Sequence, residues 1–266
     1  MVRHYPSSSV TDAQWAVIGP LLPPAGNTAG RGGRPEKWPR RLVLDAIFYL
    51  VRGGIAWRAL PAGFPPAPTV YGFFARWARA GLWQRLHDAL RDRLRIRLGR
   101  DPRPSAAIID SQSIQGSEQV HRATRGYDAG KKTNGRKRHI AVDTNGLLLA
   151  VVVTVASIQD RDGAIRLLAA LDGKFSTIRH IWADAGYAGR FVTWAGQVLK
   201  TTVEIVKRSD APGFQLLHRR WVVERTFGWL LKHRRLVRDY ETRPDHHEAL
   251  VHIALAMTMS RRLSRP

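Results

Sequence analysis

The chain has 266 residues, of which 44% are hydrophobic and 9% aromatic, so it can bury a sizeable core and is not an intrinsically disordered tail. Its 43 Lys and Arg outnumber 21 Asp and Glu, and the formal net charge of +22 favours a polyanionic partner. Nucleic acid is the first candidate, and an anionic membrane surface is the alternative. The lack of cysteine excludes disulfides and Cys-based zinc sites.

The sequence contains no pattern typical of a membrane protein. Its first residues, MVRHYPSSSV, lack the apolar core of a signal peptide. The longest apolar run, 147–158, is shorter than the ~20 residues that a transmembrane helix needs, and we interpret it as a buried strand. We therefore expect a cytoplasmic protein that does not bind membranes.

Two helices are predicted near the N-terminus. Thr11 and Gln14 are spaced as a capping box, which predicts a helix that begins there. A Pro/Gly-rich loop, PPAGNTAGRGGRP, separates it from a second helix at about 40–52, which Gly53-Gly54 ends.

Two more helices follow. Thr69 is predicted to cap the third, which has an apolar stripe at helical spacing, and leucines four residues apart predict the fourth, at about 82–98. Residues 1–103 are therefore interpreted as a basic, all-helical, helix-turn-helix-like DNA-binding domain. The tract GRDPRPS is interpreted as the linker to a second domain at 104–266.

The second domain has an α/β pattern. Asn145-Gly146 between two apolar runs is a strong hairpin signal. The predicted strands are 106–110, 136–143, 147–156, 178–183 and 202–206, and the predicted helices are 160–171, 189–199, 216–236 and 244–263. A hairpin followed by βαβ crossovers gives a mixed sheet in the order of ribonuclease H-like domains, although other α/β folds share part of this order.

Three acidic residues stand in apolar settings. Asp110 and Asp184 each end a hydrophobic strand, and the carboxyl ends of strands in an α/β sheet are where ligands bind. Glu224 is predicted to share a helix face with Trp221, Phe227, Gly228 and Leu231 that packs onto the sheet. Three converging carboxylates repel one another, and divalent cations such as Mg²⁺ or Mn²⁺ would remove that penalty.

Each of these acids also has an ordinary structural interpretation. An Asp at the end of a strand often caps a turn, and a Glu on a helix is often solvated. We assign Asp160 and Asp162 to a helix N-terminus and Asp143 to the hairpin turn.

The second domain contains two groups of basic residues. We expect them to bind DNA phosphates, and the alternative is that they form an ordinary solvated surface. One group lies on the hairpin: Lys131, Lys132, Arg136, Lys137, Arg138 and His139. The other flanks Glu224: Arg219, Arg220, Arg225, Lys232, His233, Arg234, Arg235 and Arg238.

With these motifs, nearly the whole chain resembles transposases of the insertion sequence five family within the DDE superfamily. The N-terminal motifs are VTDAQWAVIGPLLPP, GGRP and GIAWRALPAGFPPAPTVYGFFARW. The C-terminal motifs are DSQS, RGYDAGKKTNGRKRHIAVDTNGLLLAVVVTVASIQDRDGA, DAGYAG and RRWVVERTFGWLLKHRRL. The family's catalytic triad falls on Asp110, Asp184 and Glu224.

The resemblance implies a ribonuclease H-like domain that uses two Mg²⁺ ions, or Mn²⁺ in their place, held by these three residues. It implies cleavage at the terminal inverted repeats of the element by water, and then attack of the freed 3′-hydroxyl on target DNA. It also implies a homodimer or larger synaptic complex and a bacterial, nucleoid-associated protein. The expected DNA-binding residues are Lys137, Arg138, Arg220, Arg225, Lys232, Arg234 and Arg235.

The family signature around the glutamate is only partly present. Arg220 matches its Arg, whereas its Tyr falls on Leu217 and its Lys on Leu231. Lys232 or Arg234 is the candidate replacement for the missing cation. The alternatives to a transposase are a nuclease on the same fold and a DNA-binding protein that does not transpose, such as a decayed or domesticated copy.

Overall fold

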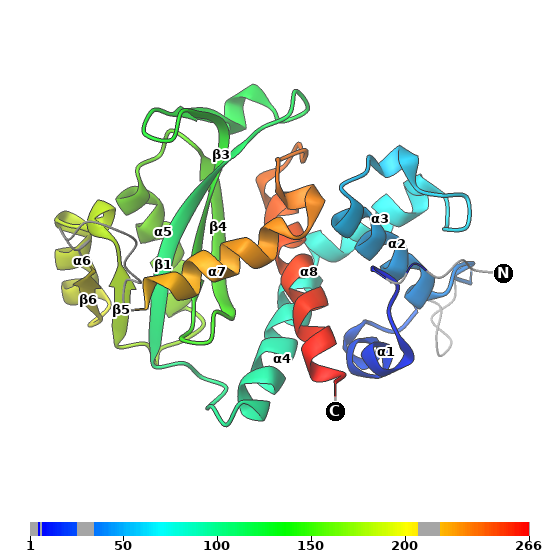
Figure 1. The fold of residues 1–266 in the computed structure, drawn as a ribbon, viewed down its shortest axis with the longest axis horizontal. Helices are drawn as coiled ribbons and strands as arrows, with labels where there is room; N and C mark the ends of the chain where they lie inside the picture. Colours follow the sequence, from blue (N-terminus) through cyan, green and yellow to red (C-terminus); the bar gives the residue numbers. More distant parts are fainter. Residues whose placement is uncertain (1–4, 6, 26–34, 207–218, 266) are drawn as a thin grey trace. The chain divides into compact units, whose positions relative to one another are not determined.

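The computed structural model describes residues 5, 7–25, 35–206 and 219–265, and the chain forms two compact units (Figure 1). The first unit comprises Met1–Leu98, Lys232–Leu236 and Ala249–Pro266, and the second comprises Gly99–Leu231 and Val237–Glu248. The first unit therefore contains C-terminal segments as well as the N-terminal helices. The sequence pattern predicts a single boundary at residue 103 and no such C-terminal contribution.

The first unit is helical. Its main helices are α1 (Asp12–Ile18), α2 (Arg40–Gly53), α3 (Ala67–Arg79), α4 (Leu82–Arg97) and the greater part of α8 (Pro244–Leu263). Short 3₁₀ helices are η1 (Gly19–Leu21), η2 (Trp57–Ala59) and η5 (Arg234–Leu236). Each of the four predicted N-terminal helices is present.

The helix ends follow the local sequence in two cases and depart from it in one. Thr11 and Gln14 form the predicted capping box of α1, and Gly54 adopts a left-handed conformation at the end of α2. Helix α3 begins at Ala67, two residues before Thr69, so the prediction that Thr69 caps it is wrong. Pro68 explains the earlier start, because proline fits the first helical turn, where its missing N–H is not needed.

The core of the first unit combines aliphatic and aromatic side chains. Ile18, Leu44 and Ile47 are fully buried. The rings of Trp77 and Trp83 meet edge to face with centroids 5.3 Å apart. Pairs of this kind add stability beyond the area that they bury.

The second unit is built on a six-stranded mixed sheet. Its strands are β1 (Ala106–Gln115), β2 (Gly126–Asp128), β3 (Thr133–Val142), β4 (Leu148–Val155), β5 (His180–Ala183) and β6 (Thr202–Ile205). β3 pairs antiparallel with β1, β2 and β4, whereas β5 pairs parallel with both β1 and β6. This confirms the α/β fold class with a mixed sheet after a helical N-terminal region. The short strand β2 was not predicted.

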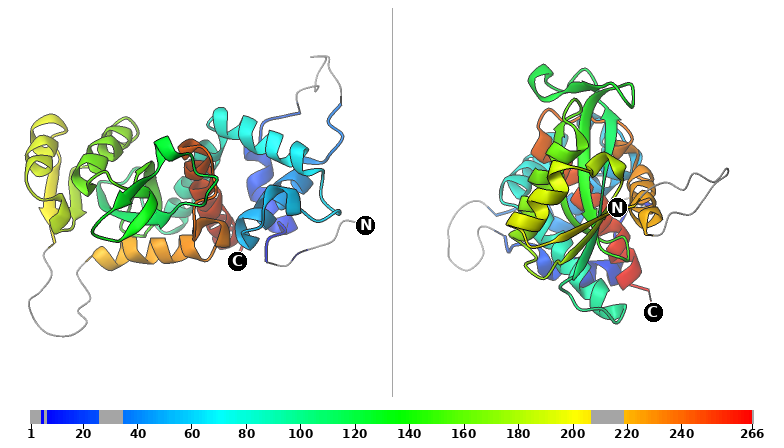
Figure 2. Two further views of the ribbon diagram at one scale, coloured as in Figure 1. Left: turned by 90° about the horizontal axis from the view of Figure 1, so that it is seen from above. Right: turned by 90° about the vertical axis from the view of Figure 1, so that its left-hand side faces the viewer.

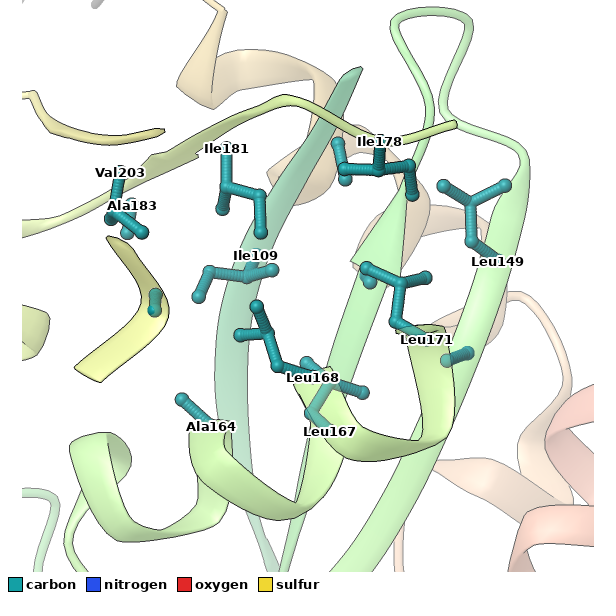
Figure 3. Packing of buried hydrophobic residues seen from close by; sticks show 14 of the residues in the cluster. Ile109, Leu149, Ala164, Leu167, Leu168, Leu171, Ile178, Ile181, Ala183 and Val203 are labelled. Atoms are coloured by element: carbon teal, nitrogen blue, oxygen red, sulfur yellow. The ribbon is translucent and has the colours of Figure 1, made fainter. Parts of the chain in front are cut away.

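One face of the sheet is covered by α5 (Asp160–Asp172) and α6 (Arg190–Val198). Figure 3 shows Leu168 of α5 pointing toward Ile109 of β1, and Leu171 of α5 on the side of Ile178 and Leu149. The alternating pattern of the strands directs these side chains to one face, so the cluster fixes the register of β1 against β5.

The other face carries α7 (Arg220–Leu231), and Figure 2 shows α7 and α5 on opposite sides of the sheet. The hairpin between β3 and β4 anchors α7, because Thr226 Oγ1 donates to the Gly146 carbonyl at 2.8 Å. Gly146 has φ +79°, and a Cβ there would lie 2.9 Å from Thr226 Oγ1, so both the turn and the contact require glycine.

The remaining predicted elements of the second unit are present within a few residues of their predicted ends. The segment 216–218 of the predicted helix 216–236 lies outside the described residues, and the helix ends at Leu231 before η5 begins at Arg234. Asp143 accepts from the N–H groups of Asn145 and Leu147, which confirms its place in the hairpin turn. In the described part of the chain, none of the helices is long and apolar enough to span a membrane.

Candidate active site

Asp110 lies on β1, and Asp184 directly follows β5, the parallel neighbour of β1 (Figure 1 shows the two strands). The register pairs Ile108 of β1 with Trp182 of β5, so the two acids come level two residues further along. Asp184 directly follows β5, as predicted, and its Oδ1 accepts from the N–H of Gly186 at 2.8 Å. Asp110 was predicted to end its strand, but β1 continues to Gln115 because residues beyond Asp110 pair with β3.

The carboxyl group of Asp110 is held in a low-dielectric setting. Burial raises the pKa of Asp110 to about 6, the N–H of Ser111 acts in the opposite direction, and the charge of Asp184 raises the pKa further. Ser111 N donates to Asp110 Oδ1 at 2.7 Å. An acid with this pKa is one that a nearby cation would ionise fully at neutral pH.

Glu224 is linked to this pair through Arg220. The Nη2 atom of Arg220 lies 3.5 Å from Asp184 Oδ2 and 3.8 Å from Glu224 Oε1. The guanidinium therefore stands between the two carboxylates and offsets their charge. The Glu224 side chain keeps 57% of its surface exposed.

The predicted packing face of α7 is wrong. Trp221 and Leu231, which were expected to pack on the sheet beside Glu224, are 37% and 41% exposed. The buried stripe is instead Val222, Val223, Thr226, Phe227 and Leu230. This stripe follows helical spacing equally well and buries the β-branched and aromatic side chains, so Glu224 lies at the solvent-facing side of the helix.

Two residues near the acids were not assigned to the site from sequence. Tyr187 is buried next to them: burial raises the pKa of its hydroxyl well above the ordinary value, and the charges of Asp110, Asp160 and Asp184 act in the same direction. Asp160 lies in the first turn of α5, as predicted, but a Cβ on Gly186 would be 3.9 Å from its Oδ2. An acid in the first turn of a helix already has a local explanation, so the sequence pattern does not indicate this second contact.

A network of hydrogen bonds joins Asp160 to Asp110. Lys137 Nζ lies 2.9 Å from Asp160 Oδ1 and 3.0 Å from Asp128 Oδ2. Ser111 Oγ donates to the same oxygen of Asp160 at 2.7 Å, and the Ser111 N–H donates to Asp110. Lys137 therefore fixes Ser111 through Asp160, and Ser111 fixes the carboxylate of Asp110.

The basic run on β3 is buried rather than presented to solvent. Arg136, Lys137, Arg138 and His139 are all less than 5% exposed, because β3 is a central strand with both faces covered. Arg138 Nε donates to Gln112 Oε1 at 3.0 Å, and its guanidinium lies over the ring of Phe227. In this conformation Lys137 and Arg138, both expected to bind DNA, are not accessible to a phosphate.

Arg136 forms a second buried network that was not predicted. Its Nη1 atom lies 2.9 Å from Asp239 Oδ2, and His247 Nδ1 lies 3.0 Å from the other oxygen of Asp239. Burial raises the pKa of Asp239, but these partners outweigh it and bring the pKa to about 2. The two partners are about a hundred residues apart in the sequence, so no local pattern indicates the pair.

The other cations expected to bind DNA differ in exposure. Lys232 and Arg234 are exposed, and Arg220 is half-buried beside the acids. Arg225 is half-buried, donates to the Asn145 carbonyl, and lies between the rings of Trp221 and Trp229. Arg235 is buried and donates to the Ile55 carbonyl at 3.0 Å. Leu217, at the position of the family's Tyr, lies outside the described residues.

Asp110, Asp184 and Glu224 have the carboxylate oxygens that a divalent metal ion needs as ligands. The three side chains are not close enough together to bind one ion jointly. Carboxylate oxygens are the ligands that Mg²⁺ and Mn²⁺ prefer. Burial, together with the charge of Asp184, raises the pKa of Asp110, and a cation bound between the two acids would offset both effects. Among the residues described, no three acidic or histidine side chains are grouped closely enough to hold a metal ion. Asp110 and Asp184 are near enough for their charges to interact, whereas Arg220 stands between Asp184 and Glu224.

A mixed sheet in which β3 pairs antiparallel and β5 pairs parallel, after a helical N-terminal region, is consistent with the ribonuclease H-like class of domains. Residues 101–259 match the family model described as "Transposase DDE domain", and residues 10–87 match "Putative transposase of IS4/5 family". The chain belongs to the DDE superfamily of insertion-sequence transposases.

Two relatives come from insertion element IS402 of Burkholderia cepacia. An "uncharacterized 16.2 kDa protein" of this element is 36% identical over 110 residues, which cover 40% of this chain and 72% of the relative. A "putative transposase for insertion sequence element IS402" is 32% identical over 130 residues, which cover 46% of this chain and 62% of that relative. The chain is therefore similar to part of each relative, and the similarity supports the family assignment.

Proposed function

We propose that this transposase cuts DNA at the terminal inverted repeats of its element and joins the freed ends to target DNA, with Asp110, Asp184 and Glu224 as the catalytic acids. The observation that carries the proposal is the placement of Asp110 on β1 and of Asp184 directly after the parallel strand β5, two residues beyond the pair Ile108–Trp182, with a raised pKa at Asp110. Two carboxylates held this way form a site for cations beside a phosphodiester.

The chemistry consists of two displacements at phosphorus. In the first, the oxygen of water forms a bond to phosphorus, the bond to the 3′-oxygen breaks, and that oxygen leaves as a 3′-hydroxyl. In the second, this hydroxyl attacks a phosphodiester of the target and displaces the target's own 3′-oxygen. Bound Mg²⁺ or Mn²⁺ would activate the attacking oxygen and stabilise the leaving one.

The protein's own groups bind and orient. Asp110 and Asp184 would hold the cations, and Glu224 would add a carboxylate from α7. Ser111 and the Lys137–Asp160 pair keep the carboxylate of Asp110 in one orientation. Arg220, beside Asp184, is positioned to contact a phosphate oxygen, and Arg225, Lys232 and Arg234 extend the contact with the DNA backbone.

A strand-transfer assay tests the proposal. The donor is a duplex of the element's end with a free 3′-hydroxyl already exposed, and the target is a supercoiled plasmid. Joined products that require Mg²⁺ or Mn²⁺ are expected, because these cations would activate the attacking 3′-hydroxyl. Joining both ends of the element would require a homodimer or larger synaptic complex. Nicked plasmid without joined product would indicate a nuclease on the same fold.

A further inference from the structure

A cavity in the first unit is separate from the acids described above. It has a volume of about 520 Å³ and is lined by Ser7, Ser8, Tyr49, Arg52, Lys232 and Arg234. The lining comes from the segment before α1, the last turns of α2 and the segment that follows α7. A water molecule occupies about 30 Å³ in the liquid, so the cavity has room for a much larger group.

The cavity is strongly positive. Arg52, Lys232 and Arg234 line it, and none of its lining residues is acidic. The nearby end of α2 contributes about half a negative charge through the helix dipole, which cannot balance three cations. Like charges gathered in this way repel one another unless an anion binds between them.

Backbone contacts hold these cations in place. Arg52 Nη1 donates to the Lys232 carbonyl at 2.7 Å. A Cβ on Gly54 would lie 2.7 Å from the Cβ of Arg234, so the two segments approach as closely as glycine allows. The cavity is therefore a fixed feature of the first unit rather than a chance gap between long side chains.

Ser8 provides the second, independent observation. Its side chain is only 3% exposed, and its Oγ atom has no hydrogen-bond partner in the described part of the chain. Leaving a buried hydroxyl unpaired costs about 1–3 kcal/mol. Ser8 is one of the residues that line the positive cavity, and a serine hydroxyl without a partner is a donor that an anionic ligand can use.

The electrostatics of His233 agree with this interpretation. His233 lies between Lys232 and Arg234 in the chain and is 2% exposed. Burial lowers its pKa to about 3, and the charges of Arg52 and Arg261 lower it in the same direction. The region therefore already has a positive potential that an anion would reduce.

We infer that this cavity binds one phosphate group of the DNA backbone, with Ser8, Arg52 and Arg234 as donors and Lys232 as a further cation. The choice of DNA as the source of the phosphate rests on the proposed function. A phosphate contact carries no sequence information, so the site would hold any duplex in register without selecting bases. It would fix the chain immediately beyond α7, the helix that carries Glu224.

The first experiment uses inorganic phosphate as the probe. Thermal unfolding of the full chain is followed in phosphate and in chloride at equal ionic strength, for the wild type and for Ser8→Ala, Arg234→Gln and the exposed control Arg100→Gln. Phosphate is expected to raise the Tm of the wild type and the control, and not that of the other two variants. Ser8→Ala removes an unpaired hydroxyl, so its Tm in chloride should not fall.

Equal Tm values in phosphate and chloride for the wild type would overturn the inference. So would a phosphate response that survives in both Ser8→Ala and Arg234→Gln. In that case the cations would serve only to stabilise the end of α2, and Arg234→Gln would lower the Tm equally in both salts.

The second experiment identifies the source of the phosphate. Binding to a duplex is measured at several salt concentrations, and Arg234→Gln is expected to lower the slope of log K against log salt by about one. Single methylphosphonate substitutions then scan the duplex. One neutralised position should weaken binding to the wild type and have no further effect on Arg234→Gln.

If no position behaves this way although inorganic phosphate still binds, the cavity takes a free phosphate and the inference about DNA is wrong. The strand-transfer assay separates this result from failure of the proposed function. If the protein joins DNA but its Tm does not respond to phosphate, the inference about the cavity is wrong and the proposed function stands. If its Tm responds to phosphate but it neither cleaves nor joins DNA, the proposed function is wrong and the phosphate site stands.

Discussion

Lys137 illustrates how one buried side chain connects the sheet to the acids. Its ammonium group bridges Asp128 and Asp160, and Asp160 in turn holds the Ser111 hydroxyl. Burial lowers the pKa of Lys137, but the hydrogen bonds with Asp160 and Asp128 outweigh it and keep the pKa above the ordinary value. The residue is thus charged and paired rather than available for a phosphate.

Lys137→Met is expected to remove the ammonium group that bridges the half-buried carboxylates of Asp128 and Asp160. A hydrogen bond to a charged group contributes about 1.5–3 kcal/mol, so the free energy of unfolding in urea should fall by about this amount. Cleavage should fall as well, because Ser111 no longer fixes Asp110. Lys132→Met changes an exposed residue outside this network and is the control. It should change the free energy of unfolding by less than about 0.5 kcal/mol.

His139 gives the protein a pH-dependent stability. It is fully buried with its ring against Gly163, and burial lowers its pKa from 6.5 to about 4. Between these values the unfolded chain binds a proton that the folded chain does not, so stability falls as the pH falls from 6.5 to about 4. The full effect is about 3 kcal/mol.

The comparison of wild type with His139→Gln isolates this effect. Urea unfolding at pH 7.5 and pH 4.5 should show a larger loss of stability in the wild type than in the variant. Other groups, including Asp110, titrate in both proteins and cancel in the difference. Equal losses in the two proteins would show that His139 is not held neutral in the folded state.

At the scale of an element, α7 shows what a helical pattern leaves undecided. Two apolar stripes exist on this helix, and the sheet selects the one with Val222, Val223 and Phe227. This choice leaves Glu224 at the edge of the helix that faces solvent, next to Arg220. An acid in this position can meet DNA and metal ions without first being uncovered.

Adjacent leucines of α7 test its orientation. Leu230 is fully buried and Leu231 is 41% exposed. Leu230→Ala should cost about 2–5 kcal/mol because it removes buried methyl groups and leaves a cavity, whereas Leu231→Ala should change stability by less than about 0.5 kcal/mol. Similar losses from both, measured by urea unfolding, would indicate the packing face that the sequence pattern first favoured.

At the scale of the whole molecule, the sequence predicts the order of elements well, because capping residues, Asn-Gly turns and apolar periodicity are local signals. It also places Asp110 and Asp184 together, since parallel neighbouring strands end at the same edge. The sequence does not indicate that the cations of β3 are buried. Their partners, such as Asp239 for Arg136, are distant in sequence, and a basic run looks the same whether it is solvated or paired.

Contacts between distant parts of the chain also account for the other differences between the predicted and the observed structure. The association of 232–236 and 249–266 with the N-terminal helices depends on long-range packing that no linker marks. The role of Asp160 beside Asp184 depends on how closely the start of α5 approaches Gly186. A residue that satisfies a local rule, such as an acid in the first turn of a helix, gives no signal of a second contact.

The proposal that Asp110, Asp184 and Glu224 are the catalytic acids is tested most directly by cleavage of a labelled duplex that carries the element's own ends. The assay is run in Mg²⁺, Mn²⁺ or EDTA with the wild type, Asp184→Asn and the exposed control Asp172→Asn. Nicking at the element's end is expected with either metal, none in EDTA, none with Asp184→Asn, and wild-type nicking with Asp172→Asn. Salt-sensitive DNA binding without cleavage in any metal, or cleavage that survives in Asp184→Asn, would contradict the proposal.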